Sequence, residues 1–195
     1  EKEKVGLVVI DEQHRFGVEQ RNVLRSKGNF PHVLTLSATP IPRTLALIFF
    51  GELDVSILDQ MPRERKTPKT YLVSSEKRAG AYDFIRKHVL TGEQAFIVCP
   101  LIEESETLQS VRSVKLEYER LTKDIFPELK LGLLHGKLSS KTKNKVLEEF
   151  RNNNFSILVA TPVVEVGLDI PNATIILIEA ADRFGLASLH QLRGR

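Results

Sequence analysis

A pair of carboxylates follows the first apolar run of the chain. Residues 11–14 (DEQH) come directly after residues 5–10 (VGLVVI), whose unbroken apolar character predicts a buried strand. Because α/β proteins bind ligands at the carboxyl ends of parallel strands, Asp11 is placed to hold Mg²⁺ through its oxygens. Glu12 could orient and polarise a water that attacks a phosphoryl group, and His14 could bridge to a neighbouring loop. The alternative is a solvated acidic turn.

Two small hydroxyl side chains follow the next predicted strand, at residues 32–37. Ser37 and Thr39 belong to the sequence SATP at residues 37–40. They could hydrogen-bond His14 across adjacent loops. The alternative is a turn that caps a helix, since Pro42 suits the first position of the next helix.

A basic segment with a glycine follows the predicted strand at residues 131–134. It begins with His135, Gly136 and Lys137, and no acidic residue interrupts the lysines at positions 137, 141, 143 and 145. The backbone N–H groups of such a turn, and of the helix start behind it, can bind phosphate. The alternative is a solvated helix face, partly balanced by acidic residues at positions 148 and 149.

The chain contains no Walker A sequence. Residues 132–139 (GLLHGKLS) imitate one, but they have one residue too few between the glycines, and Leu138 separates the lysine from the serine. We therefore reject a phosphate-binding P-loop at this position.

Two further polar segments lie near the end of the chain. Thr161 follows the predicted strand at residues 157–160, and residues 165–171 (EVGLDIP) come shortly after it. Gly167 permits a close approach of backbone to ligand, and Asp169 could accept a hydrogen bond from a ribose hydroxyl. The alternative is a β-turn, for which Gly, Asp and Pro are typical residues.

The last residues, 191–195 (QLRGR), include two arginines. An arginine here could stabilise the charge that develops on a γ-phosphate. The alternative is a basic tail.

The elements that position these motifs alternate along the chain. Short, near-continuous apolar runs are separated by stretches with helical spacing, which predicts a doubly wound α/β fold with parallel strands. The predicted strands are residues 5–10, 32–37, 55–58, 70–73, 95–99, 131–134, 157–160 and 174–178. The predicted helices are residues 77–90, 108–121 and a segment from Ser139 or Ser140 to about residue 151.

A domain boundary is predicted at residues 61–69 (MPRERKTPK), which hold two prolines and no hydrophobic periodicity. Residues 1–60 supply only two or three strands, fewer than the five or six typical of a sheet. We therefore expect the chain to be a piece of a longer protein.

Composition excludes several classes of protein. The 195 residues are 42% hydrophobic and 27% charged, which is ordinary for a globular protein. No apolar run approaches the ~18 residues of a membrane span. The single cysteine, Cys99, excludes an internal disulfide and favours a reducing compartment. Scattered histidines have no zinc-ligand spacing. The net charge of +3 permits a polyanionic partner without requiring one.

In order and structural setting, these motifs resemble those of superfamily 2 helicases. Residues 11–14 resemble motif II, 37–39 motif III, 158–171 motif V, and 191–195 the first part of motif VI. Longer segments are similar to the RecG family of bacterial branched-DNA helicases, namely residues 11–21 (DEQHRFGVEQR), 37–47 (SATPIPRTLAL), 99–106 (CPLIEESE) and 182–195 (DRFGLASLHQLRGR). The related transcription-repair coupling translocases share the SATPIPRTL-like segment and remain an alternative.

The resemblance implies two RecA-like lobes, with ATP and Mg²⁺ between them and branched or forked DNA as partner. Residues 1–66 would be the C-terminal part of lobe one with the linker, and residues 67–195 most of lobe two, truncated at its C-terminal end. Asp11 and Glu12 would serve Mg²⁺ and water activation. His14, Ser37 and Thr39 would couple hydrolysis to movement of the lobes. Gly167 and Asp169 would contact the nucleotide from lobe two, and Gln191 and Arg195 would reach its phosphates. DNA-backbone contact would involve His135, Gly136, Lys137 and Thr161.

The implied activity is that of an ATP-dependent DNA helicase or translocase, which remodels stalled forks and recombination junctions in the bacterial cytoplasm. Without a Walker A sequence, the 195 residues by themselves are expected not to hydrolyse ATP. The alternative function is a non-catalytic helicase lobe that binds nucleic acid.

Overall fold

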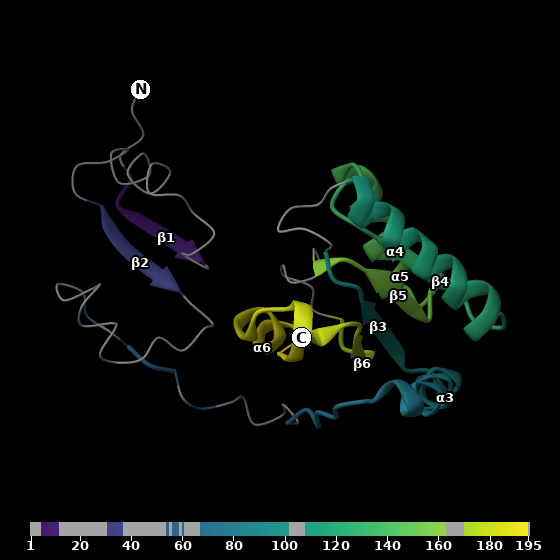
Figure 1. Ribbon diagram of the computed structural model, residues 1–195. Coiled ribbons are helices and arrows are strands. Elements are labelled where there is room, and N and C mark those ends of the chain that lie inside the picture. Colours follow the sequence, from purple (N-terminus) through teal and green to yellow (C-terminus); the bar gives the residue numbers. More distant parts are fainter. Residues whose placement is uncertain are drawn as a thin grey trace. The chain divides into compact units, whose positions relative to one another are not determined.

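The chain divides into two compact units, Glu1–Arg63 and Glu64–Arg195, in a computed structural model (Figure 1). The structure describes residues 5–11, 31–36, 54, 56–58, 60, 67–101, 108–162 and 170–194, with only the backbone of Asp11. The division falls within the proline-containing basic stretch at residues 61–69. Among the described helices, none is long and apolar enough to cross a membrane.

Among the described residues of the first unit, two parallel strands pair, β1 (Leu7–Asp11) and β2 (His32–Leu36). Their register runs from Leu7 opposite His32 to Asp11 opposite Leu36. On β1, Val8 and Ile10 are buried, whereas Leu7 and Val9 are more than half exposed, because successive side chains of a strand point to opposite faces.

The second unit is built on four parallel strands in the order β4-β5-β3-β6. Their bounds are β3 Gln94–Val98, β4 Leu131–Leu134, β5 Ile157–Ala160 and β6 Ala173–Ile178. All residues of β3 and β5 are buried, as expected for central strands of a sheet covered on both faces. These four strands were predicted from the sequence to within one residue at each end.

Helices separate these strands in the chain. The α-helices are α3 Arg78–Leu90, α4 Leu108–Arg120, α5 Ser140–Arg151 and α6 Leu186–Arg193. Short helical turns are η2 Ser75–Lys77, the π-helical η3 Leu121–Ile125 and η5 Ala181–Arg183. Helix α5 begins after Ser139, whose hydroxyl accepts a hydrogen bond from the Thr142 amide at 3.2 Å.

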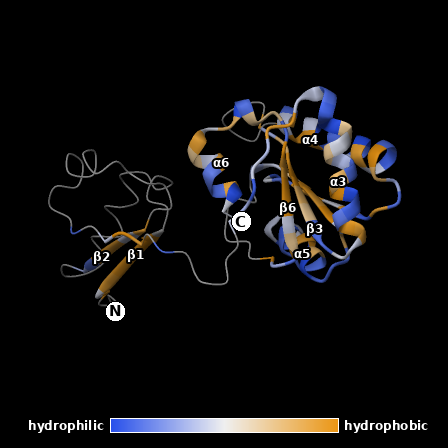
Figure 2. Ribbon diagram, turned by 90° about the horizontal axis from the view of Figure 1, so that it is seen from below, coloured by the Kyte–Doolittle hydropathy of each residue, from blue (hydrophilic) through white to orange (hydrophobic). Residues whose placement is uncertain are grey.

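Two hydrophobic clusters fill the two faces of the sheet. The first joins α3 and α4 to it through residues that include Ile85, Val114, Ile97 and Val159. The second joins α5 and α6 to it through residues that include Phe150, Leu192, Val98 and Ala160. Figure 2 shows the hydrophobic strands β3 and β6 between α6 on one side and α3 and α4 on the other. The predicted α/β fold with helices on both faces is therefore observed here.

Two predicted strands are wrong. Residues 70–73 have no regular structure, with Tyr71 and Leu72 exposed by 74% and 97%. Residues 56–58 of the predicted strand 55–58 are also irregular, and Leu58 is 97% exposed. Both runs are apolar, but neither pairs with a described strand, and an apolar run forms a strand only where a neighbour satisfies its backbone groups.

Candidate functional site at the carboxyl edge of the sheets

The strand ends of the second unit form one continuous edge. The Thr161 amide donates to the Leu134 carbonyl at 3.1 Å, the Cys99 amide to Ala160 at 2.8 Å, and the Glu179 amide to Val98 at 2.9 Å. The first residues after β4, β5, β3 and β6 therefore lie side by side. This edge is where open α/β sheets bind their ligands.

Two of the predicted DNA-contact residues are buried at this edge. His135 is 4% exposed and Thr161 is fully buried, and they follow the neighbouring strands β4 and β5. Lys137 is exposed and Gly136 is partly exposed. The structure thus brings all four residues to adjacent strand ends. A polyanion that approached this edge would meet Lys137 and Gly136 first, with His135 and Thr161 beneath them.

A tight turn connects this edge to the start of α5. The Leu138 amide donates to the His135 carbonyl at 3.2 Å, and the Ser139 carbonyl accepts from the Lys143 amide at 2.9 Å. Lys141 and Lys145 are exposed on the first turns of α5. The positive end of the helix dipole and these ammonium groups both favour an anion at the same place.

Gln191 lies on α6 and is 8% exposed. Its Nε2 atom is buried and has no hydrogen-bond partner among the described residues, although a buried amide group ordinarily has one. The neighbouring Leu192 packs into the second hydrophobic cluster and holds the helix in place. A donor of this kind can be satisfied by a bound water or by a ligand.

Asp11 is the last residue of β1 and lies opposite Leu36, the last residue of β2. The segments that begin at residues 12 and 37 therefore leave the sheet at the same edge, as the sequence predicted. Eight predicted site positions cannot be placed: the side chain of Asp11 and the residues Glu12, His14, Ser37, Thr39, Gly167, Asp169 and Arg195 lie outside the described part of the chain.

A charged cluster at the carboxyl edge of the second unit's sheet was not anticipated from the sequence. It consists of Arg78, Tyr82, Glu117, Arg120 and Glu179. Its local pairs, Arg78 with Tyr82 and Glu117 with Arg120, lie at helical spacings that sequence reading can detect. Glu179 comes from the end of β6 and only the fold brings it to them.

Electrostatics at this cluster follow from its hydrogen bonds. The bonds to Glu117 raise the pKa of Arg120, against the opposing effect of partial burial. Burial lowers the pKa of Arg78, but the Tyr82 hydroxyl and the Glu179 carboxylate raise it overall. Burial raises the pKa of the Cys99 thiol to about 12, and the negative charges of Glu117 and Glu179 act in the same direction. The guanidinium groups therefore stay charged and the thiol stays protonated.

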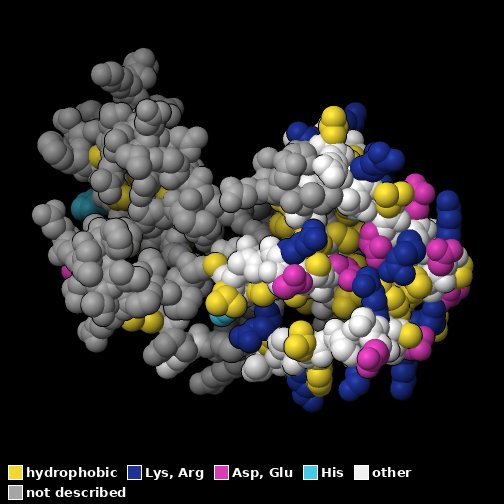
Figure 3. Space-filling view, in the orientation of Figure 1, with side chains coloured by type: hydrophobic (Ala, Val, Ile, Leu, Met, Phe, Trp, Pro, Cys, Tyr) yellow, Lys and Arg dark blue, Asp and Glu magenta, His cyan; other side chains and the backbone are white. Residues whose placement is uncertain are grey.

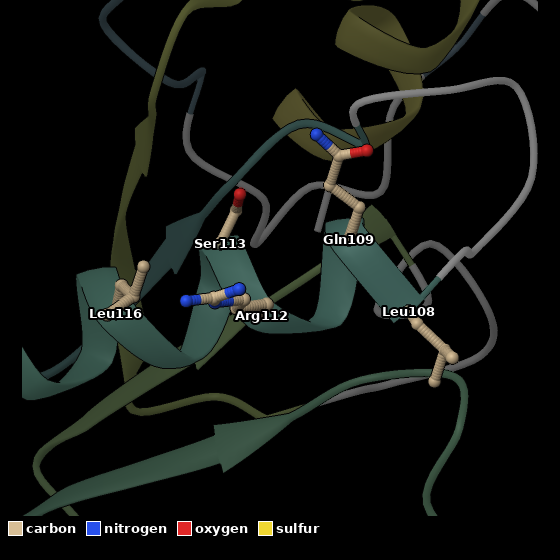
Figure 4. Close-up of a pocket in the computed structure, with 5 residues that line it drawn as sticks. All are labelled: Leu108, Gln109, Arg112, Ser113 and Leu116. Atoms are coloured by element: carbon tan, nitrogen blue, oxygen red, sulfur yellow. The ribbon is translucent and has the colours of Figure 1, made fainter.

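No metal site is seen in the described part of the chain, where no three His, Cys, Asp or Glu side chains are grouped. A pocket lies on α4, lined by Leu108, Gln109, Arg112, Ser113 and Leu116 (Figure 4). None of the predicted site residues lines this pocket. We therefore locate the candidate site at the strand ends and not in the pocket.

Comparisons with known proteins identify the family of the chain. Residues 76–195 match the family model of the helicase conserved C-terminal domain. The chain is 54% identical over 191 residues to the ATP-dependent DNA helicase RecG of Thermotoga maritima, and 53% identical over 192 residues to that of Bacillus subtilis. In both cases the match covers 98% of this chain. It covers 24% and 28% of the relatives' lengths, so the chain spans about a quarter of each.

A solved structure shows the same fold at low sequence identity. It is a single-substitution variant of Saccharomyces cerevisiae Dbp5 bound to RNA and ADP BeF3, with a TM-score of 0.69 and 18% identity, over 99% of this chain and 50% of that one. The predicted RecA-like helicase fold, with parallel sheets flanked by helices, is thereby confirmed. The resemblance to RecG seen in the sequence is confirmed by the curated relatives. Since the family model matches well over half of its residues, the chain belongs to the helicases that share this conserved C-terminal domain.

Proposed function

We propose that the chain is part of an ATP-dependent DNA helicase or translocase of the RecG type, which remodels branched DNA in repair and recombination. The observation that carries the proposal is the identity of about one half to curated RecG helicases over 98% of the chain. Both of those relatives carry the same name, which favours RecG over the transcription-repair coupling translocases. Their bacterial sources support a bacterial protein, and we place it in the cytoplasm.

In this proposal, ATP with Mg²⁺ binds at the carboxyl edge of the first unit's sheet. Asp11 holds the metal, Glu12 activates the attacking water, and His14, Ser37 and Thr39 couple hydrolysis to movement. The pairing of Asp11 with Leu36 supports this, because it starts both segments at neighbouring strand ends. By the same resemblance, Gly167 and Asp169 would contact the nucleotide, and Gln191 and Arg195 would reach its phosphates.

DNA-backbone contact is assigned to Lys137 and Gly136, with His135 and Thr161 supporting them from below. The exposed lysines at the start of α5 extend the contact. Figure 3 shows Lys and Arg side chains spread among Asp and Glu side chains over the visible face of the second unit. A mixed surface of this kind favours phosphate binding by the few lysines at the start of α5 over binding across a broad basic face.

The test of the catalytic proposal is ATP hydrolysis with and without a forked DNA. We expect no turnover from residues 1–195, because no Walker A sequence is present to hold the phosphates. A chain extended through a P-loop and a complete motif VI should hydrolyse ATP when forked DNA is added, and Glu12→Gln should abolish that activity. Undiminished turnover in Glu12→Gln would remove Glu12 from the mechanism.

A second candidate function is nucleic-acid binding by the chain alone, favoured by the lysines from position 137 to 145. Titration of a fluorescent duplex should show an affinity that falls steeply with salt. The double variant Lys141→Gln/Lys145→Gln should lower the slope of log K against log salt by roughly 2. Its matched control is Lys87→Gln/Lys115→Gln, which removes the same charge from exposed positions on α3 and α4. Equal slopes for the two variants would contradict the assignment to α5.

A further inference from the structure

The hydroxyl of Tyr82 is the centre of the charged cluster at the edge of the second unit. Its oxygen accepts from Arg78 Nε at 2.7 Å and from an Arg120 terminal nitrogen at 2.8 Å, and it donates to Glu179 Oε1 at 3.2 Å. A phenol oxygen has one proton to donate and two lone pairs. All three of its hydrogen-bonding positions are therefore used.

The cluster joins elements that are distant in the sequence. Arg78 is the first residue of α3 and also pairs directly with Glu179, at 2.7 Å. Glu117 and Arg120 of α4 pair at 2.6 Å. Tyr82 and Glu179 are 97 residues apart. The side chain of Glu179 is 15% exposed, and both of its carboxylate oxygens have partners within the cluster.

The turn that follows Glu179 has a conformation that needs support. Ala180 has φ 47° and ψ 56°, in the left-handed region that residues other than glycine rarely adopt. Its carbonyl accepts from the Arg183 amide at 3.0 Å, and that of Ala181 accepts from Phe184 at 3.1 Å. Such a backbone persists only where the surrounding structure holds it. Glu179 directly precedes Ala180, and through it the side chains of α3 can hold this turn.

We propose that Arg78 and Tyr82 are positioning residues of the site. By holding Glu179, they fix the left-handed turn at Ala180, and this turn sets the direction in which the chain enters α6 and thus the place of Gln191. The inference rests on the proposed function, in which Gln191 reaches the phosphates of ATP. It adds a set of supporting residues that motif comparison did not identify, on α3 and at the end of β6.

Two substitutions weaken the contacts of Glu179 with little change of shape. Tyr82→Phe deletes the hydroxyl and keeps the ring, which packs edge-on against Phe126 at 5.7 Å between centroids. Glu179→Gln keeps the size of the side chain and removes its charge. The control is Arg86→Gln on the same helix. Arg86 pairs with Glu128 at 2.7 Å and with Asp83 at 2.5 Å, and it also donates to the Ile125 carbonyl. None of these three partners belongs to the cluster around Tyr82.

The measurements are amide hydrogen exchange and the NMR signal of the Gln191 side-chain amide, both on the 195-residue chain. In Tyr82→Phe and in Glu179→Gln, the amides of Arg183 and Phe184 should exchange about tenfold faster, as expected for the loss of one supporting hydrogen bond. The Gln191 signal should shift in both variants. In Arg86→Gln, exchange at the turn should rise no more than in the sheet, and the Gln191 signal should stay in place.

The proposal would be overturned if the turn amides of both test variants exchanged at the wild-type rate. It would also be overturned if these amides were accelerated only as much as the amides of β3. So would an unchanged Gln191 signal in a variant whose turn has loosened. These readouts require neither ATP nor DNA. Failure of the extended chain to hydrolyse ATP would contradict the proposed function and leave this test valid.

Discussion

Cys99 illustrates how burial decides the chemistry of one residue. Its side chain is 6% exposed, and burial raises the pKa of its thiol to about 12, with Glu117 and Glu179 adding to the effect. A thiolate is the reactive form of cysteine. We therefore predict that the folded chain resists alkylation by iodoacetamide at pH 8 and reacts fully in denaturant. Because the chain has one cysteine, the label counts this site alone. Rapid labelling without denaturant would contradict the predicted burial.

The carboxyl group of Glu93 should make the free energy of unfolding depend on pH in the acid range. Hydrogen bonds from the Thr174 hydroxyl and from His88 lower the pKa of this carboxyl below its ordinary value of 4.5. A carboxyl whose pKa is lowered on folding stabilises the folded state above its unfolded pKa, and this stabilisation is lost as the pH falls below about 4.5. The free energy of unfolding of Glu93→Gln should therefore change less between pH 6 and pH 3 than that of the wild type. Urea titrations at the two pH values measure this, and identical pH dependence would rule out the contribution of Glu93.

At the scale of elements, replacing two glycines by alanine should change the free energy of unfolding in opposite directions. A Cβ at Gly132 in β4 would lie 2.8 Å from Phe155 Cδ2 and 3.1 Å from Leu158 Cδ1, within the packed core. Gly132→Ala should therefore lower the free energy of unfolding by about 1–3 kcal/mol. At Gly80 in α3, a Cβ would meet nothing within 4 Å, so Gly80→Ala should raise the free energy of unfolding by about 0.5–1 kcal/mol. Thermal or urea unfolding of the pair checks both signs.

The start of α5 depends on one side chain. Ser139 accepts from the Thr142 amide, which would otherwise lack a partner within the helix. Ser139→Ala should cost about 1 kcal/mol of stability. Ser140→Ala is the control, because Ser140 is exposed and lies one residue inside the helix, past the capping position. Equal losses in the two variants would show that the cap hydrogen bond contributes little.

At the scale of the whole molecule, the two units differ in how well they are covered. The second unit has a four-stranded sheet with a hydrophobic cluster on each face. In the first unit, Leu7, Val9, Leu34 and Leu36 are each between 43% and 58% exposed on a two-stranded sheet. Exposed apolar strands invite association. We predict that residues 1–195 associate as concentration rises, whereas residues 64–195 alone stay monomeric. Sedimentation velocity distinguishes the two, and a monomeric full chain would contradict the prediction.

Much of the site's location could be read from the chain because of how parallel sheets are built. The motifs that begin at residues 11, 37, 135 and 161 each follow an apolar run directly, and the carboxyl ends of parallel strands share one edge. The placement of His135 and Thr161 at one edge, and of Asp11 and Leu36 at another, follows from that rule. The burial of His135 and Gln191 could not be read in this way, since both are polar residues that the packing of neighbouring elements encloses.

The alternation of strands and helices and the polar motifs at the strand ends could be read from the sequence alone, because burial and local spacing are written in the order of residues. The family was indicated by the resemblance of the motifs to those of known helicases. The folded chain was needed to show that β5 lies between β4 and β3, that residues 70–73 form no strand, and that Glu179 contacts Arg78 and Tyr82. The physical reason is the same in each case. Strand pairing and ion pairs between distant residues depend on which surfaces the folded chain brings together, and no local pattern records that.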